Sequence, residues 1–130
     1  MIGLVTATAA GRRMAERLAA AWPGRTTVHS GPVADQVRAA WAAGGPLVCF
    51  LATGATVRLV AALLADKHTD PGVVCVDEAG RYAVALLGGH AAGANALAAE
   101  VAAVLGARPV VTTATDATGY PPLEIGRAHV

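Results

Sequence analysis

The stretch VVCVDEAGRYAVALL, residues 73–87, contains the turn on which the predicted sheet topology depends. Two apolar runs, Val73–Glu78 and Tyr82–Leu87, have the length and composition of buried strands. Only Ala79-Gly80-Arg81 separates them. A short loop with a central glycine is typical of a β-hairpin, because glycine adopts the left-handed conformation that such turns need. The sequence therefore predicts two adjacent antiparallel strands here.

Strands and helices alternate on both sides of this hairpin. Gly93–Leu105 follows it as an amphipathic helix that ends at Gly106. The other predicted strands are Ile2–Thr6, Thr26–His29, Leu47–Ala52 and Pro109–Thr113, and the other helices are Gly11–Trp22, Val33–Ala43 and Thr56–Ala65. The order βαβαβαββαβ predicts an α/β three-layer sandwich, with helices on both faces of a mixed, mostly parallel sheet of about six strands. We assign residues 1–119 to this domain and residues 120–130, where the pattern fades, to a linker or chain-end remnant.

The hairpin divides the polar loops between two edges of the sheet. A crossover helix keeps two strands parallel, whereas a hairpin reverses direction, so Tyr82–Leu87 and Pro109–Thr113 should run opposite to the other strands. One edge then carries Thr53, Gly54, Arg58 and the turn 77–81, and the other carries Lys67, Asp70, His90, Asn95 and Asp116. The second group is the more compact polar cluster and is the predicted site.

The composition limits the classes of function. The chain has 130 residues, 55% hydrophobic and 15% charged, as expected of one folded domain. A net charge of +1 and an aromatic content of 4% argue against nucleic-acid binding, which uses clustered basic residues and stacking aromatics. Apolar runs are shorter than the about 18 residues of a membrane span. The first arginines follow the apolar N-terminal stretch, the reverse of a secretory signal. We expect a cytoplasmic protein without a membrane partner, in which Cys49 and Cys75 are buried, reduced thiols.

Two basic residues have alternative explanations. Arg58 is predicted in the first turn of the helix 56–65, where the helix dipole disfavours a cation. We therefore expect it to face a carboxylate, either that of Asp77 or Glu78 or that of a ligand. Lys67, the only lysine of the chain, is either a cation at a helix C-terminus or a ligand contact.

The turn Gly88-Gly89-His90 presents one imidazole among small residues. The glycines permit unusual dihedral angles and the close approach of a backbone or a ligand, and Asn95 can cap the following helix. His90 is either a capping residue with a satisfied imidazole or the acid–base group of a crowded pocket. Neither GxGxxG nor GxxxxGK(S/T) is present, which disfavours a phosphate-binding loop and a nucleotide-binding module.

Motifs in a fixed order run from Leu51 to Asp116. They are Thr53-Gly54…Arg58, Asp66-Lys67…Asp70-Pro71, Asp77-Glu78-x-Gly80, Gly89-His90-x-x-Gly93-Ala94-Asn95 and Thr112-Thr113-Ala114-Thr115-Asp116. In these motifs the chain resembles the N-terminal domain of the CbiG family of cobalamin-biosynthesis proteins, the cobalt-precorrin-5A hydrolases. The resemblance is dense over this range and loose over residues 1–50. Gly88 stands where the family often has Ser, and Ala92 where it often has Gly.

The resemblance implies a function in the anaerobic route to the corrin ring. Family members open the δ-lactone of cobalt-precorrin-5A and release acetaldehyde, leaving cobalt-precorrin-5B. The implied catalytic acid–base residues are His90 and Asp116, with Asp77 and Glu78 as further proton-transfer groups. The implied substrate-binding residues are Lys67, Asp70, Gly88, Gly89, Asn95, Thr53, Gly54 and Arg58. No cofactor or protein-bound metal is expected, since the substrate carries the cobalt.

The resemblance also implies partners and leaves an alternative. Family members continue into a middle segment and a C-terminal domain, and some are fused to a precorrin-3B C17-methyltransferase. The implied partners are the cobalt-tetrapyrrole substrate and these further domains. The alternative is a non-catalytic module that recognises the tetrapyrrole or docks those domains. It is favoured by the lack of a complete nucleophile, base and orienting set in the sequence.

Overall fold

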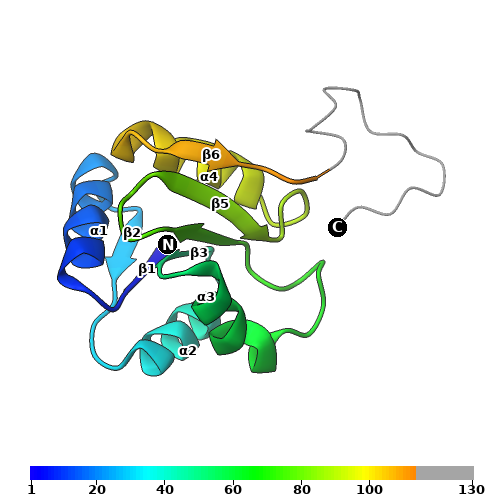
Figure 1. Cartoon of the computed structure of the whole chain (residues 1–130). Coiled ribbons are helices and arrows are strands. Elements are labelled where there is room, and N and C mark those ends of the chain that lie inside the picture. The colour runs from blue at the N-terminus through cyan, green and yellow to red at the C-terminus, as the bar shows by residue number, and fades with distance from the viewer. Residues whose placement is uncertain (114–130) are drawn as a thin grey trace.

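A computed structural model describes residues 1–113 as an α/β sandwich around one sheet (Figure 1). The strands are β1 (Ile2–Thr6), β2 (Thr26–Val28), β3 (Leu47–Phe50), β4 (Val73–Val76), β5 (Tyr82–Leu87) and β6 (Arg108–Val110). The helices are α1 (Ala9–Ala21), α2 (Val33–Ala43), α3 (Thr53–Val60) and α4 (Ala94–Leu105), and a short 3-10 helix, η1 (Ala61–Leu63), follows α3. The predicted order of strands and α-helices is confirmed.

The six strands lie in the order β2-β1-β3-β4-β5-β6. β1 pairs in parallel with β2 and β3, and β3 pairs in parallel with β4. β5 is antiparallel to β4 and parallel to β6, so β5 and β6 run opposite to the rest, as the hairpin predicted. Gly80 has a φ of 68°, and the Asp77 carboxylate accepts the N–H groups of Arg81 and Tyr82 at 2.8 and 2.7 Å, which closes the turn.

Helices cover both faces of the sheet, which confirms the predicted three layers (Figure 1). Successive strand residues point to opposite faces, so a strand buried on both sides must be apolar throughout. On one face, α1 and α4 pack on alternate strand residues such as Leu4, Val48 and Val74. On the other face, α2 and α3 pack on the residues between them, such as Val5 and Cys49.

Several boundaries differ from the predicted ones. α1 begins at Ala9 because the Thr8 hydroxyl accepts the N–H of Gly11 at 3.0 Å and caps the helix. α3 begins at Thr53 instead of Thr56, since the carbonyl of Ala52 already accepts the N–H of Thr56 at 3.0 Å.

Within residues 1–113, no helix has the length and apolar character needed to cross a bilayer.

Cys49 and Cys75 are register partners on β3 and β4. Both are free and buried, which confirms the prediction made for them. Burial raises the pKa of each thiol above its ordinary value, so both stay protonated and unreactive at neutral pH.

A buried glutamine ties the end of β1 to the start of α2. Gln36 accepts the N–H of Thr6 at 3.0 Å and donates to the carbonyls of Thr6 and Gly31, each at 2.8 Å. Gln36 is only 3% exposed. One side chain thus satisfies three backbone groups.

Candidate functional site

Loops from separate parts of the chain meet at the edge of the sheet where β5 ends. Since β5 runs opposite to β4, its carboxyl end lies beside the segment that enters β4. The loop before β4, residues 64–72, and the loop before α4, residues 88–93, therefore gather at this edge, on the right of Figure 1. We call it the His90 edge.

A cavity of about 290 Å³ lies between these two loops. It is lined by Leu64, Ala65, Asp66, Lys67, Asp70, Pro71, Leu87 and Gly88. It brings together Lys67, Asp70 and Gly88, which the sequence analysis assigned to substrate binding. Its wall is apolar apart from the ammonium and carboxylate groups, which suits a ligand that combines hydrocarbon with a charged group.

Asp70 shapes the loop that presents Lys67. One oxygen of the Asp70 carboxylate accepts the N–H groups of Ala65 and Asp66, at 2.9 and 3.1 Å. The backbone N–H of Asp70 donates to the carbonyl of Asp66 at 2.7 Å. These bonds close a tight loop in which Lys67 is exposed. Asp70 therefore shapes the loop that holds Lys67, in addition to any contact that Asp70 itself makes with a ligand.

A second cavity, of about 600 Å³, borders the loop 88–93. It is lined by Gly89, His90, Gly93, Asn95, Ala96 and Val111. His90 is exposed in the loop, whereas the Asn95 amide donates to the hydroxyl of Thr113 at 3.1 Å. That bond ties the start of α4 to the segment after β6. The cavity thus has one imidazole at its mouth and a fixed amide in its wall.

The glycines of this loop are required by the protein's own packing. Gly88 has a φ of 70°, and a Cβ added there would lie 2.8 Å from the Cβ of Ala92 and 3.1 Å from the Cα of Gly72. A Cβ on Gly89 would lie 2.7 Å from the side-chain oxygen of Asn95. The sequence left open whether a backbone or a ligand approaches these glycines, and the space beside them is filled by protein atoms.

The loop also caps α4 with main-chain groups. The carbonyl of Gly88 accepts the N–H groups of Ala92 and Ala94 at 3.2 and 3.1 Å, and that of Gly89 accepts the N–H of Asn95 at 3.1 Å. These bonds satisfy donors that a helix start leaves open. His90 is therefore held on a short loop that is anchored at both ends.

The opposite edge carries the remaining predicted residues. Thr53 and Gly54 form the first turn of α3, and Arg58 lies in its last turn. The predicted placement of Arg58 in a first turn was wrong, because α3 begins earlier than its apolar pattern indicated. At the end of a helix the dipole favours a cation, so the argument that Arg58 needs a carboxylate partner falls away. The Asp77 carboxylate is occupied by the hairpin N–H groups.

Two predictions fall outside the described residues, and one contact was missed. Asp116 and the domain boundary at residue 119 lie beyond residue 113. Thr113, which is 5% exposed, was part of a recognised loop but was not assigned to the site. Only its pairing with Asn95, 18 positions away, reveals its role.

Among residues 1–113, no group of three or more His, Cys, Asp or Glu side chains is placed to hold a metal ion.

Known proteins are similar to this chain in sequence and in fold. The model of the family described as Cobalamin synthesis G N-terminal matches residues 35–116, which include both loops of the His90 edge. The chain is 49% identical over 86 residues to the cobalt-precorrin-5A hydrolase of Salmonella typhimurium, covering 66% of this chain and 24% of the relative. It is 46% identical over 79 residues to that of Priestia megaterium, covering 61% of this chain and 21% of the relative. The chain thus spans about a quarter of the length of these relatives.

A solved structure has the same architecture. A crystal structure described as that of a homolog of cobalamin biosynthesis protein G, from Sulfolobus solfataricus, superposes with a TM-score of 0.69 at 27% identity. The superposition covers 86% of this chain and 36% of that one. The family match spans most of the chain, including every described residue of the His90 edge. The chain belongs to the CbiG N-terminal family of cobalamin-synthesis proteins.

Proposed function

We propose that this chain is the N-terminal domain of a cobalt-precorrin-5A hydrolase of anaerobic cobalamin biosynthesis. The reaction opens the δ-lactone of cobalt-precorrin-5A and releases acetaldehyde, which gives cobalt-precorrin-5B. The observation that carries the proposal is the identity of 46–49% to two proteins of that name, over a range equal to about two thirds of this chain. The chain spans only a quarter of those relatives, so we expect full turnover to require further polypeptide.

The chemistry of the His90 edge supports this substrate. Cobalt-precorrin-5A is a flat macrocycle edged with acetate and propionate carboxylates. The Lys67 ammonium, at the rim of an apolar cavity, suits one such carboxylate. Gly88, Gly89 and Asn95 line the two cavities of this edge and are proposed to contact the edge of the macrocycle. Thr53, Gly54 and Arg58 lie away from this group and are proposed as contacts of a second part of the substrate.

Proton transfer is the chemistry that His90 can supply. Lactone hydrolysis adds water across the ester bond, and the loss of the two-carbon fragment as acetaldehyde moves further protons. Imidazole is a common general acid or base in catalysis, and His90 lies exposed in its loop. We propose His90 as one acid–base group and Asp116, which lies outside the described residues, as another. The cobalt ion is part of the substrate, and we propose no cofactor and no metal held by the protein.

The proposed partners and location follow from the same function. The partners are the cobalt-tetrapyrrole and the middle and C-terminal domains of the same protein, with a fused methyltransferase in some members. We propose a cytoplasmic location and no nucleic-acid or membrane partner, in keeping with the net charge of +1 and the low aromatic content.

Substitutions at the His90 edge should weaken substrate binding. In a titration followed by the absorbance of the macrocycle, Lys67→Ala is expected to raise the Kd for cobalt-precorrin-5A by about 10-fold or more, the effect of losing one charged hydrogen bond. His90→Ala should weaken binding less and abolish most of the turnover seen when the complete protein is assayed. His68→Ala is the matched control, because His68 is an exposed neighbour of Lys67 in the loop 64–72. Parent-like binding and turnover by His90→Ala would contradict its assignment.

A second candidate function is a recognition or assembly domain without chemistry of its own. The lack of a complete nucleophile, base and orienting set in the sequence favours it. Acetaldehyde released by this chain alone, measured by coupled reduction with alcohol dehydrogenase and NADH, would eliminate it. Binding without any acetaldehyde would favour it, whereas the absence of both binding and acetaldehyde would contradict the substrate site.

A further inference from the structure

A third cavity borders the loop that carries His90. It has a volume of about 430 Å³ and is lined by Met1, Ile2, Gly24, Arg25, Pro46, Ala92, Gly93, Leu97 and Glu100. Gly93 lines both this cavity and the one at His90, so the two adjoin at the start of α4. The lining residues from the first half of the chain were not among the site residues predicted from the sequence.

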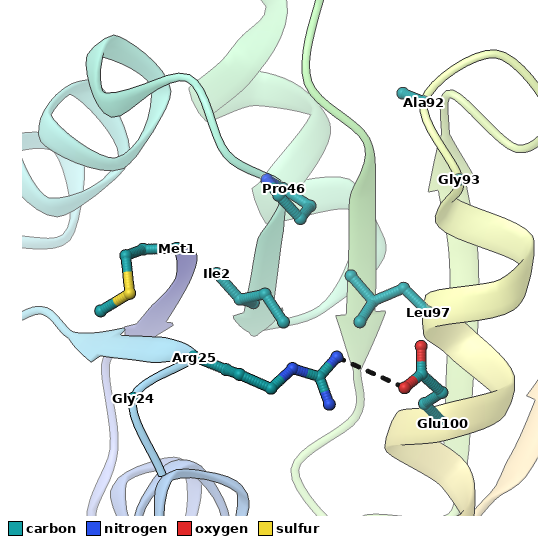
Figure 2. Close-up of a pocket in the computed structure, with 9 residues that line it drawn as sticks. All are labelled: Met1, Ile2, Gly24, Arg25, Pro46, Ala92, Gly93, Leu97 and Glu100. Carbon is teal, nitrogen blue, oxygen red and sulfur yellow. Dashed lines mark hydrogen bonds and ion pairs between the residues drawn. The ribbon is translucent and has the colours of Figure 1, made fainter. Parts of the chain in front are cut away.

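Arg25 reaches across this cavity (Figure 2). It extends from the start of β2 to Glu100 on α4, with Nη2 of Arg25 3.4 Å from Oε1 of Glu100. Its guanidinium also lies over the ring of Trp22, 4.7 Å from the ring centroid. Both charged side chains of the pair are about half exposed, at 49% and 50%. An ion pair this exposed is weak and can be exchanged for another carboxylate, while the stacking on Trp22 keeps the guanidinium in place.

The other walls of the cavity are apolar. Ile2 and Leu97 are 7% and 6% exposed, and Pro46 lies beside them (Figure 2). A hydrocarbon arm that ends in a carboxylate matches this combination of an apolar wall and one guanidinium. Acetate and propionate arms have that chemistry.

We propose that this cavity extends the candidate site, and that Arg25 binds a peripheral carboxylate of the tetrapyrrole in place of Glu100. The inference rests on the proposed function. Residues 88–93 then border three cavities, each with one basic side chain: Lys67, His90 and Arg25. A macrocycle with carboxylates around its rim can engage basic groups on several sides of one loop. Arg25 thereby acts as a specificity residue for the carboxylate pattern.

Uroporphyrin tests this inference, because it is a fluorescent tetrapyrrole whose rim carries only acetate and propionate arms. The full chain is titrated into it and fluorescence anisotropy is measured. Arg25→Ala is expected to raise the Kd by about 5- to 20-fold, the effect of one partly exposed charged hydrogen bond. Arg25→Lys should restore most of the affinity. Glu100→Gln should lower the Kd by about 2- to 5-fold, because it removes the competing carboxylate of a weak pair.

Arg38→Ala is the matched control, since Arg38 is another exposed arginine in an ion pair, with Asp35 on α2. Thermal unfolding of each variant reports whether the fold is kept. If the parent binds and Lys67→Ala weakens binding, while Arg25→Ala and Glu100→Gln leave the Kd unchanged, this inference is overturned and the proposed function stands. If the parent shows no saturable binding, the tetrapyrrole site itself is contradicted, and the inference with it.

Discussion

Replacing Gln36 by methionine is expected to lower the free energy of unfolding by about 3–5 kcal/mol. Methionine keeps the volume of the side chain, so no large cavity forms. It removes the acceptor for the N–H of Thr6 and the donors for the carbonyls of Thr6 and Gly31. Each buried backbone group left without a partner costs about 1–3 kcal/mol. For a domain of this size, with about 5–15 kcal/mol of stability, that is a large share.

Urea unfolding followed by circular dichroism measures this effect. Gln36→Glu is the informative companion, because a carboxylate still accepts the N–H of Thr6 but faces two carbonyl oxygens. Its destabilisation should shrink as the pH falls, when the protonated carboxyl regains one donor. Gln36 lies at the edge opposite His90, so Gln36→Met should leave tetrapyrrole affinity unchanged wherever the protein is folded. A loss of less than about 1 kcal/mol would mean that water replaces the amide.

Gly88→Ala should cost about 2–5 kcal/mol of stability and also weaken binding at the His90 edge. The left-handed φ of 70° costs a residue with a Cβ about 1–2 kcal/mol. The added methyl would lie 2.8 Å from the Cβ of Ala92 and 3.1 Å from the backbone of Gly72, so the loop must shift, at a cost of about 1–3 kcal/mol. Since this loop holds His90, the shift displaces the imidazole.

Gly106→Ala separates the two causes. Gly106 ends α4 with a φ of 71°, and an added Cβ meets no atom within 4 Å. We expect it to show the dihedral cost alone, about 1–2 kcal/mol, with tetrapyrrole affinity unchanged. Equal losses in the two variants, measured by chemical denaturation, would show that the crowding at Gly88 carries no cost.

Much of the candidate site was predictable because its cause is local. The hairpin at residues 77–81 needs only a glycine between two apolar runs, and once it reverses the chain, Lys67 and His90 must share an edge. The placement of Arg58 failed for a local reason as well. Thr53 and Gly54 lack the apolar spacing of a helix, although the chain there is helical, so the predicted start of α3 was three residues late.

Contacts between distant segments were beyond sequence reasoning. Gln36 looks like an ordinary polar residue of an amphipathic helix until its amide is found against the end of β1. Arg25 and Glu100 are 75 positions apart and meet only because β2 and α4 approach the same edge. No short-range pattern marks such pairs, because their energy arises from the packing of whole elements.

Sequence patterns alone were enough to predict the succession of strands and helices, the reversal at Gly80 and the edge at which the polar motifs gather. These depend on apolar periodicity and turn chemistry, which act over a few residues. The folded structure was needed to reveal the strand order, the start of α3, the burial of Gln36 and the cavity at Arg25. These depend on which surfaces bury each other, and that is set by long-range packing free energy, which no local stretch of the chain contains.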